Sequence, residues 1–409
     1  MLIVCIRKYG VWVYLGSDYV LKKVFEKAVS GKALIKERKV LRADHIPEKL
    51  LFRDDEIKAV AESLSPLLKG SRASNLLLYG KPGTGKTVVA KYVIKHLQEG
   101  AKKMNVNVWL AYTNTHNAGT EYTVLVEIAA DLGLQVPSTG LASNVVFKKI
   151  VMHVEQLKLN TVFVLDEIDH LAKEYGDILY EMTRANERLK QGSIGLIGIS
   201  NDLNFKEFLD PRVLSSLSEE EIVFPPYTVQ ELKAILRERA KDGFHQGVVS
   251  DAAINLCAAK AGSEHGDARR AVDLLRVAGE VAEREGSSLV EEKHVRIAET
   301  KIEQDKASEA LRSLAMHEKL VVYSVMLSEK GSTGDVFDRY QAICKKLGLE
   351  SLTQRRVGMI ISELDMLGLI SAPVISHGRY GRTKKISLAV QPSVVKDVFK
   401  QDSVTANLF

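Results

Sequence analysis

Eight consecutive residues have the types and spacing of a phosphate-binding loop. Residues 80–87 read Gly-Lys-Pro-Gly-Thr-Gly-Lys-Thr and match the pattern GxxxxGK[ST] in full. Glycines let backbone N–H groups turn inward around phosphate oxygens. Lys86 would reach the β and γ phosphates, and the Thr87 hydroxyl would bind Mg²⁺. The pattern therefore predicts a site for ATP or ADP with Mg²⁺, held by Gly83, Thr84, Gly85, Lys86 and Thr87.

Two adjacent carboxylates follow an apolar segment further along the chain. Residues 161–165 are apolar or β-branched, and Asp166 and Glu167 follow them directly. At the carboxyl edge of a parallel sheet, Asp166 would hold the Mg²⁺ shell and Glu167 would polarise the attacking water as a general base. A solvated helix cap after a core strand is the alternative, and the complete phosphate loop upstream favours catalysis. We expect the third acid, Asp169, to be a helix N-cap.

Three further polar residues are of types that suit the γ phosphate. Asn201 follows an apolar segment at 194–199 and would orient the water or contact the phosphate. Arg212, in Asp-Pro-Arg, and one of Arg269 and Arg270, near the start of a helix, would offset negative charge. Taken alone, these signals are weak, because a turn residue after a strand and solvated arginines are the usual explanation of such positions.

The elements that position these residues divide the chain into parts. Short runs rich in branched residues, separated by helical stretches, predict buried parallel strands with crossover helices. Residues 228–300 predict helices, with caps at Thr228, Ser250 and Asp267. We therefore expect an extension at 1–40, an α/β domain at 41–226, a helical domain at 227–305 and a C-terminal domain at 306–409. The predicted strands are 75–79, 106–112, 161–165, 194–200 and 221–224.

Composition excludes several classes of protein. The 409 residues are 45% hydrophobic and 27% charged, which is typical of a globular chain and not of a disordered or collagenous one. The net charge of +5 is compatible with a polyanionic partner. The three cysteines are far apart, and the histidines lack metal-ligand spacing. With no membrane helix and no export signal, we expect a cytoplasmic protein.

The C-terminal part has the pattern of a helix followed by a basic hairpin. Ser351-Leu-Thr-Gln354 predicts a capping box, followed by an apolar stripe at helical spacing that includes Leu367. Arg355 lies on the opposite face, with Arg356 at its flank. Arg379, Arg382 and Lys384 fall in or beside the hairpin turn. This is the sequence form of a winged helix, which binds DNA or protein.

Together, these motifs resemble the AAA+ ATPases and, within them, the archaeal Orc1/Cdc6 replication initiators. The likeness covers roughly residues 40–400 and rests on GKPGTGKT, VFVLDEID, GISND, DPRVLSSL, YTVQEL and GDARRAVDLLR. It implies an AAA+ parallel-sheet domain, a helical lid and a C-terminal winged helix. It also implies a sensor-1 role for Asn201, an arginine finger at Arg212, a sensor-2 role for Arg269, and positions near the nucleotide for Tyr227 and Arg239.

The resemblance implies an initiator with weak ATPase activity that acts as an ATP/ADP switch. Double-stranded origin DNA, the replicative helicase and paralogous initiators are the expected partners, with no membrane, and nucleoid association is the expected location. DNA contacts are expected from Arg355, Arg356, Arg379, Arg382 and Lys384. The alternative is a clamp-loader-like or transposition-helper ATPase whose tail binds protein.

Overall fold

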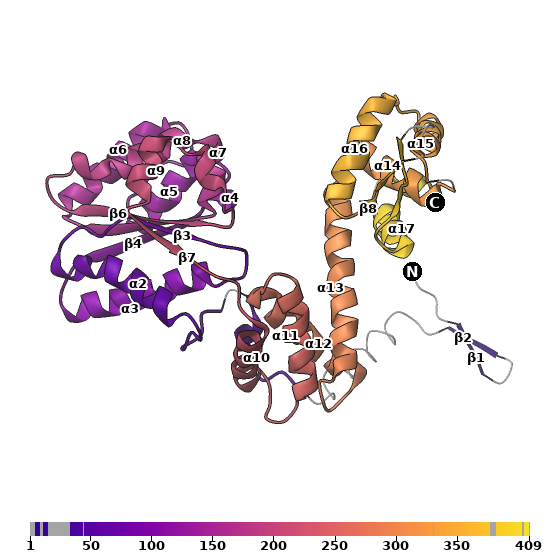
Figure 1. Ribbon diagram of the computed structural model, residues 1–409, viewed down its shortest axis with the longest axis horizontal. Coiled ribbons are helices and arrows are strands. Elements are labelled where there is room, and N and C mark those ends of the chain that lie inside the picture. The colour runs from indigo at the N-terminus through magenta and orange to yellow at the C-terminus, as the bar shows by residue number, and fades with distance from the viewer. Residues whose placement is uncertain are drawn as a thin grey trace. The chain divides into compact units, whose positions relative to one another are not determined.

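The computed structural model of the chain describes residues 5–8, 11–14, 33–43, 45–329, 331–376, 382–402 and 405–408. Two compact units, Met1–Val295 and Arg296–Phe409, make up the chain. The helix α13 (Glu292–Ser313) contains the boundary between them, and the boundary expected at residue 305 lies inside this helix (Figure 1). Near the N-terminus, β1 (Cys5–Lys8) and β2 (Val11–Tyr14) form an antiparallel hairpin.

A five-stranded parallel sheet is the centre of the first unit. Its strands lie in the order β4-β5-β6-β3-β7. All five predicted strands are confirmed, with ends shifted by at most two residues. Their bounds are β3 Leu76–Tyr79, β4 Val108–Asn114, β5 Asn160–Asp166, β6 Ser193–Ser200 and β7 Glu220–Val223.

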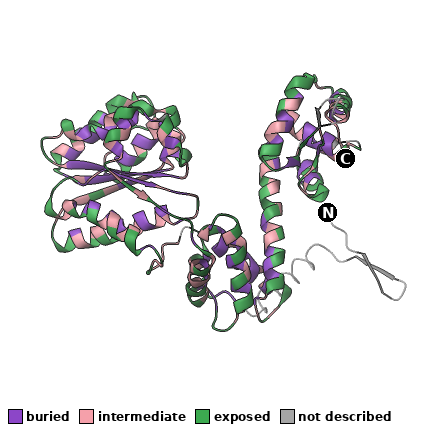
Figure 2. Cartoon of the chain, in the orientation of Figure 1, coloured by how far each residue is buried: buried purple, intermediate pink, exposed green. Residues whose placement is uncertain are grey.

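Helices cover both faces of this sheet, which is why its inner strands β3, β5 and β6 are almost continuously buried. In β5, Val162 and Val164 pack with α2 (Asp54–Leu64) and α3 (Lys86–Lys103), whereas Phe163 and Leu165 face the other core. Figure 2 shows buried residues along the sheet between these helical layers. The second layer contains α4 Thr115–Ala118, α5 Glu121–Asp131, α6 Ser143–Gln156, α7 Ile168–Glu174, α8 Gly176–Thr183 and α9 Pro211–Leu217.

Strand register aligns the carboxyl ends where the predicted site residues lie. Asp166, the last residue of β5, pairs with Asn114 on one side and Ile199 on the other. Tyr79, the last residue of β3, pairs with Ser200. The phosphate loop, the carboxylate pair and the segment after β6 therefore begin at the same edge of the sheet, which is where ligands bind in open parallel sheets.

Three capped helices form the lid. They are α10 (Val229–Gly243), α11 (Asp251–Ser263) and α12 (Ala268–Glu285). Thr228 and Glu231 form a reciprocal capping box at α10, and the caps at Ser250 and Asp267 are also as predicted. Each cap accepts a hydrogen bond from a backbone N–H that would otherwise lack a helical partner.

An extended segment from before the sheet domain packs on this lid. Within residues 33–43, which include the 3₁₀ turn η1 (Arg38–Leu41), Leu34 and Leu41 are almost fully buried. The N–H groups of Lys36 and Glu37 donate to the Gly243 carbonyl. We call residues 33–43 the N-terminal strap. The sequence placed residues 1–40 in an extension and did not predict their contact with the lid.

The second unit is a winged helix. Three helices, α14 (Met316–Leu327), α15 (Thr333–Leu347) and α16 (Gln354–Met366), precede the strands, and α17 (Pro392–Gln401) follows them. Strand β8 pairs with β11 and β9 pairs with β10, both antiparallel. The fold class predicted from the sequence is confirmed. The strands are β8 Ile370–Ser371, β9 Val374–Ser376, β10 Arg382–Lys384 and β11 Ser387–Leu388.

Two details predicted for α16 are wrong. Its N-cap is Thr353, whose side chain accepts from the Arg356 N–H, and not Ser351. Both types cap well, and the helix simply begins two residues later than expected. Leu367 is 59% exposed and does not join the buried stripe. The helix has ended at Met366, and Leu369 and Ile370 enter the core in its place.

Two findings concern membranes and metals. Within the part of the chain that the structure describes, no helix combines the length and apolarity needed to cross a membrane. Among the same residues, no group of three His, Cys, Asp or Glu side chains could hold a metal ion.

Candidate nucleotide site and winged-helix surface

The phosphate loop joins β3 to α3 in a conformation that depends on glycine. Gly83 and Gly85 have φ of +73° and +96°, in the left-handed region that L side chains rarely adopt. Gly85 is also the N-cap of α3. The Lys86 ammonium is nearly buried and donates to the carbonyls of Gly80 and Lys81, at 2.8 Å each. The loop thus holds its lysine at the N-terminus of α3, where the helix dipole favours an anion.

Burial changes the titration of this lysine. It lowers the pKa of Lys86 from 10.5 to about 8. The negative charge of Asp166 opposes the shift, and the positive charge of Arg269 adds to it. A bound phosphate would favour the charged form, because an opposite charge nearby raises the pKa of an ammonium group.

The carboxylate of Asp166 is held from two sides. Its Oδ2 accepts from the Thr87 hydroxyl at 3.0 Å and from the Tyr112 hydroxyl at 2.7 Å. Burial and the Asp166 charge both raise the pKa of Tyr112, so it stays a donor. Thr87 and Asp166 thus bring a hydroxyl and a carboxylate together beside the phosphate loop. Oxygen donors of this kind suit Mg²⁺, and the residues present fit that ion.

Glu167 occupies an unusual backbone position at the start of α7. Its φ and ψ are +55° and +43°, a left-handed conformation uncommon for a residue with a side chain. Its N–H donates to Asp166 Oδ1 at 3.0 Å. The expectation that Asp169 caps this helix is wrong, because Glu167 holds the cap position. Asp169 lies in the first turn and accepts from the Ser200 hydroxyl at 3.0 Å.

Asn201 comes directly after β6, the strand between β5 and β3 in the sheet. Because Ser200 is in register with Tyr79, Asn201 begins its turn beside the start of the phosphate loop. The structure therefore brings Asn201, Asp166 and the loop to one edge, as the sequence predicted.

The lid reaches the phosphate loop through the start of α12. The Ala268 N–H donates to the Gly83 carbonyl at 3.2 Å, and the Asp267 carboxylate lies against Gly83. Arg269 is exposed, and its charge acts on both Lys86 and Tyr112. The predicted lid arginine therefore lies within electrostatic range of the site.

The sequence did not single out Arg53, whose side chain links the phosphate loop to the segment between β7 and α10. This residue is only 3% exposed. Its Nε donates to the Thr84 carbonyl at 3.0 Å and its Nη2 to the Pro225 carbonyl at 2.6 Å. Its guanidinium stacks 3.8 Å from the centre of the Tyr227 ring, and the Tyr227 hydroxyl lies against Gly85. In the sequence, Arg53 follows Phe52 and precedes three acidic residues, a pattern that does not indicate a buried arginine.

Arg239 contacts the chain just before the sheet domain. Its Nη1 donates to the Val40 carbonyl at 3.0 Å and its Nη2 to the His45 carbonyl at 3.2 Å. The predicted position near the nucleotide stays a prediction. What the structure adds is that Arg239 fixes the strap to α10.

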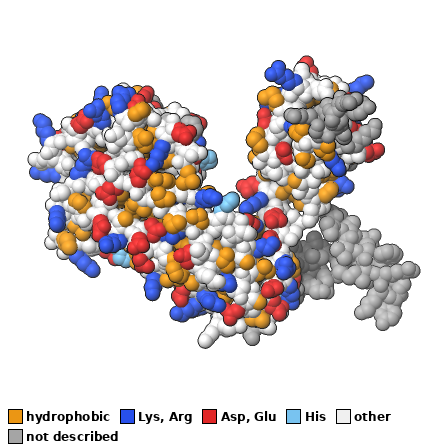
Figure 3. All heavy atoms as spheres, viewed as in Figure 1, with side chains coloured by type: hydrophobic (Ala, Val, Ile, Leu, Met, Phe, Trp, Pro, Cys, Tyr) orange, Lys and Arg blue, Asp and Glu red, His pale blue; other side chains and the backbone are white. Residues whose placement is uncertain are grey.

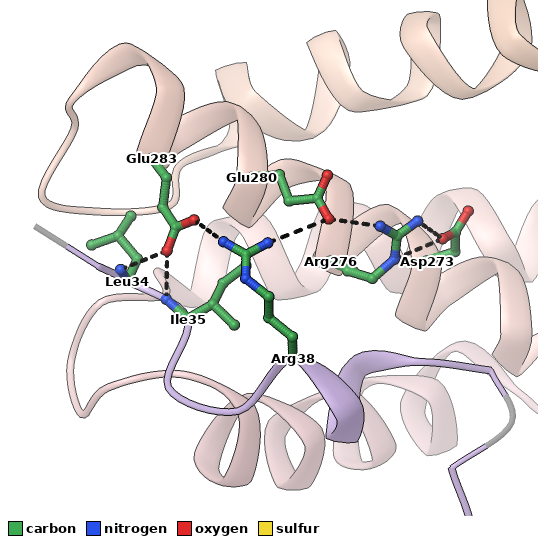
Figure 4. Close-up of polar contacts among 7 residues, drawn as sticks. All are labelled: Leu34, Ile35, Arg38, Asp273, Arg276, Glu280 and Glu283. Carbon is green, nitrogen blue, oxygen red and sulfur yellow. Dashed lines mark hydrogen bonds and ion pairs between the residues drawn. The ribbon is translucent and has the colours of Figure 1, made fainter. Parts of the chain in front are cut away.

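A row of charged side chains fixes the strap to α12 as well. Glu283 accepts from the N–H groups of Leu34 and Ile35 and from Arg38, at 2.7–3.0 Å (Figure 4). Glu280 then bridges Arg38 and Arg276. The strap is thus bonded near the end of α12 opposite to Arg269, about 21 Å away along the helix.

Arg212 is not part of this cluster. Its side chain is 70% exposed at the start of α9, and its guanidinium makes two hydrogen bonds to Asp210 at 3.0 and 2.8 Å. It also lies over the Tyr180 ring of α8, 4.9 Å from the ring centre. An exposed, pre-oriented arginine of this kind is suited to contact a second molecule.

The exposed face of α16 carries the residues predicted to meet DNA. Arg355 is exposed and makes no hydrogen bond or ion pair within the described part of the chain. Arg356 pairs with Glu363 at 3.3 Å. Lys384 donates to the Ser362 hydroxyl at 2.7 Å, which ties β10 to α16. Arg379 lies outside the described residues, as does the Arg382 side chain.

One face of the molecule carries charges of both signs. On the face shown in Figure 3, Lys and Arg side chains are interspersed with Asp and Glu. Attraction to a polyanion would therefore come from local groups on that face, because no extended patch of one sign is present there.

Three family descriptions match successive parts of the chain. Residues 69–205 match "AAA domain", residues 233–300 match "Cdc6 AAA+ ATPase-type lid domain", and residues 309–398 match "CDC6, C terminal winged helix domain". The ORC1-type DNA replication protein of Cenarchaeum symbiosum is 48% identical, covering 94% of this chain and 96% of that protein. The chain belongs to the ORC1-type DNA replication proteins.

Solved structures agree with this assignment. The ORC1-type chain is similar to the Aeropyrum pernix ORC1 protein, solved in complex with DNA, with 45% identity and a TM-score of 0.84. That alignment covers 92% of this chain and 100% of the other. The Aeropyrum pernix ORC2 protein, solved as ADPNP-ADP complexes, is 25% identical with a TM-score of 0.61, over 91% and 100% of the two chains. The predicted family, Orc1/Cdc6, is confirmed.

Proposed function

We propose that this ORC1-type protein binds duplex DNA at replication origins, with bound ATP or ADP as its switch, and helps to recruit the replicative helicase. One observation carries the proposal. The same chain has a phosphate loop closed by the lid and a winged helix in which α16 exposes Arg355. The A. pernix relative solved with DNA, similar over nearly the whole chain, supports the same reading.

Nucleotide binding uses the loop, its helix and the lid. Backbone N–H groups around Gly83, Thr84 and Gly85 hold the phosphates, and Lys86 supplies a positive charge that the bound phosphates in turn stabilise. Thr87 and Asp166 would hold Mg²⁺, which offsets phosphate charge when bound. Tyr227 and Arg239 lie on the lid side of the nucleotide. The A. pernix ORC2 protein, solved with ADPNP and ADP, supports this ligand class.

Hydrolysis is weak and works as a switch. Glu167 accepts the proton of the attacking water, and Asn201 orients that water. Arg269 offsets charge from the lid, so a change in the γ phosphate changes how strongly α12 is held against the loop. Arg212, exposed on α9, acts on the nucleotide of an adjacent initiator, either a second copy or a paralogue.

DNA recognition divides between helix and wing. Arg355, unpaired within the described chain, is placed to read base edges in the major groove, and Arg356 contributes to the same face. Arg379 and Arg382 contact phosphates from the wing, with Lys384 aligning β10 against α16. A protein with these contacts associates with the nucleoid. The helicase contact belongs to the same proposal and rests on family membership.

The test is selection of genomic fragments by the purified chain against random competitor DNA, at two salt concentrations. A few discrete duplex sites, enriched at both salts by the wild type and lost in Arg355→Ala, are expected. Uniform and steeply salt-sensitive binding would indicate phosphate attraction alone. That outcome would favour a clamp-loader-like or transposition-helper ATPase whose tail binds protein.

A further inference from the structure

The backbone of Glu167 is held at both of its polar groups. Its N–H donates to Asp166 Oδ1, and its carbonyl accepts from the Thr115 hydroxyl at 2.5 Å and from the His170 N–H at 3.1 Å. Left-handed conformations of residues with side chains persist only where surrounding contacts fix them. These three hydrogen bonds fix the left-handed conformation of Glu167.

Thr115 reaches this carbonyl because of the strand register. Asn114 and Asp166 are paired at the ends of β4 and β5, so the residues that follow them, Thr115 and Glu167, leave the sheet side by side. Thr115 is fully buried and is the first residue of α4. The Asn114 side chain caps that short helix by accepting from the Asn117 N–H, which fixes where α4 begins.

A second contact keeps α4 against α7. The His116 and His170 rings meet edge to face, with centroids 5.5 Å apart. Thr115 and His116 therefore hold the first turn of α7 from one side.

We propose that Thr115 is a positioning residue for the catalytic base: its hydroxyl holds the Glu167 peptide left-handed, and so sets where the Glu167 carboxylate lies. This inference rests on the proposed function, in which Glu167 is the base. Without the hydroxyl, the carbonyl keeps only the His170 N–H, and the peptide can rotate toward ordinary values. The Cα–Cβ bond then turns with it, and the carboxylate leaves the line of the attacking water.

Nucleotide binding does not depend on this bond. Lys86 donates to loop carbonyls, and Asp166 Oδ2 accepts from Thr87 and Tyr112. None of these bonds involves Thr115 or Glu167, because the Glu167 N–H donates to the other carboxylate oxygen, Asp166 Oδ1. The inference therefore predicts a loss of turnover without a loss of affinity, a split that general destabilisation would not give.

The test compares three variants of the full chain by single-turnover ATP hydrolysis, fluorescent-nucleotide binding and thermal unfolding. Thr115→Val removes the hydroxyl at nearly constant volume. Thr115→Ser is the conservative variant, which keeps a hydroxyl at this position. Thr161→Val is the matched control, since Thr161 is equally buried on β5 and donates to the Ser193 carbonyl at 2.9 Å, at the end of the strand far from Asp166.

Thr115→Val should hydrolyse ATP about tenfold or more slowly, since small misplacements of a catalytic group have effects of this size. Its nucleotide affinity should stay within about threefold of the wild type, a change of less than 1 kcal/mol. Thr115→Ser should recover most of the rate, and Thr161→Val should keep it. Wild-type hydrolysis by Thr115→Val, or equal loss in Thr115→Ser, would overturn the proposal.

Glu167→Gln separates this inference from the proposed function. If Glu167→Gln hydrolyses ATP normally, Glu167 is not the base, and the proposed function is at fault. If Glu167→Gln is inactive and Thr115→Val is unaffected, only the positioning role fails. Combining the two substitutions should give the rate of Glu167→Gln alone, because Thr115 acts through that carboxylate.

Discussion

Asp267, the capping residue of lid helix α12, lies directly against Gly83 in the phosphate loop. A Cβ added to Gly83 would come within 1.8 Å of Asp267 Oδ1. The lid therefore closes on the loop at a point where the loop has no side chain. Together with the bond from the Ala268 N–H to the Gly83 carbonyl, this contact places the start of α12 over the phosphate site.

Gly83→Ala should abolish tight nucleotide binding, because the methyl group displaces the Asp267 carboxylate and with it the cap that holds the start of α12 over the loop. Gly70→Ala is the control. Gly70 has nearly the same φ, +71°, but nothing lies within 4 Å of its added Cβ. Gly70→Ala should lower the free energy of unfolding by about 1 kcal/mol, through left-handed strain alone, and should not change ADP binding. Titration with fluorescent ADP distinguishes the two, and equal affinities would contradict the lid contact.

Nucleotide affinity should fall as the pH rises past about 8, where buried Lys86 loses its proton. Binding would then require proton uptake, since phosphates favour the charged ammonium. Calorimetric titration with ADP at pH 7 and pH 9, in buffers of different ionisation enthalpy, should detect this uptake at pH 9 only. The same uptake at both pH values would exclude Lys86 as its source.

The same pKa predicts how the stability of the nucleotide-free chain changes with pH. Because the folded pKa lies below the ordinary value of 10.5, the unfolded chain binds more protons between pH 8 and 10.5. The contribution of Lys86 to the free energy of unfolding therefore rises with pH across that window. Denaturant melts of Lys86→Met, compared with the wild type, should lack this rise.

Strand periodicity and loop spacing predicted most of the sheet and the phosphate site, because both are local in sequence. The missed contacts join distant residues. Arg53 and Pro225 are 172 residues apart, Thr115 and Glu167 are 52 apart, and the strap bond to Glu283 spans 249. No local pattern encodes such pairs. The cap of α16 was misplaced for a different reason, since two residues of capping type stand close together and packing decides between them.

Loosening the strap should weaken the lid at a distance from the nucleotide. Glu283→Ala leaves the N–H groups of Leu34 and Ile35 without their partner, which costs about 1–3 kcal/mol of unfolding free energy. Release of ADP should also become faster, because the strap holds the end of α12 opposite to Arg269. The control is Asp273→Ala. Asp273 lies on the same helix, and in the network of Figure 4 it pairs only with Arg276. An unchanged rate of ADP release in Glu283→Ala would show that the strap does not help to retain the nucleotide.

The two arginines of α16 should differ in their effects on DNA. Arg356 is held by Glu363, whereas Arg355 has no such partner among the described residues. Arg355→Ala should cost about 1–3 kcal/mol at a preferred duplex and less on random DNA, as expected for a base contact. Arg356→Ala should weaken both duplexes slightly and alike. A larger effect of Arg356→Ala on the preferred site would reverse the assignment.

The central claim is that a nucleotide-loaded initiator reads duplex sequence through its winged helix. The most direct measurement is the ratio of affinities for a selected genomic duplex and its scrambled version, at one fixed salt concentration, with ATP-loaded and ADP-loaded protein. We expect a ratio of about 10³ or more in at least one nucleotide state, typical of specific DNA binding, and a different ratio in the other. A ratio near one in both states would contradict it.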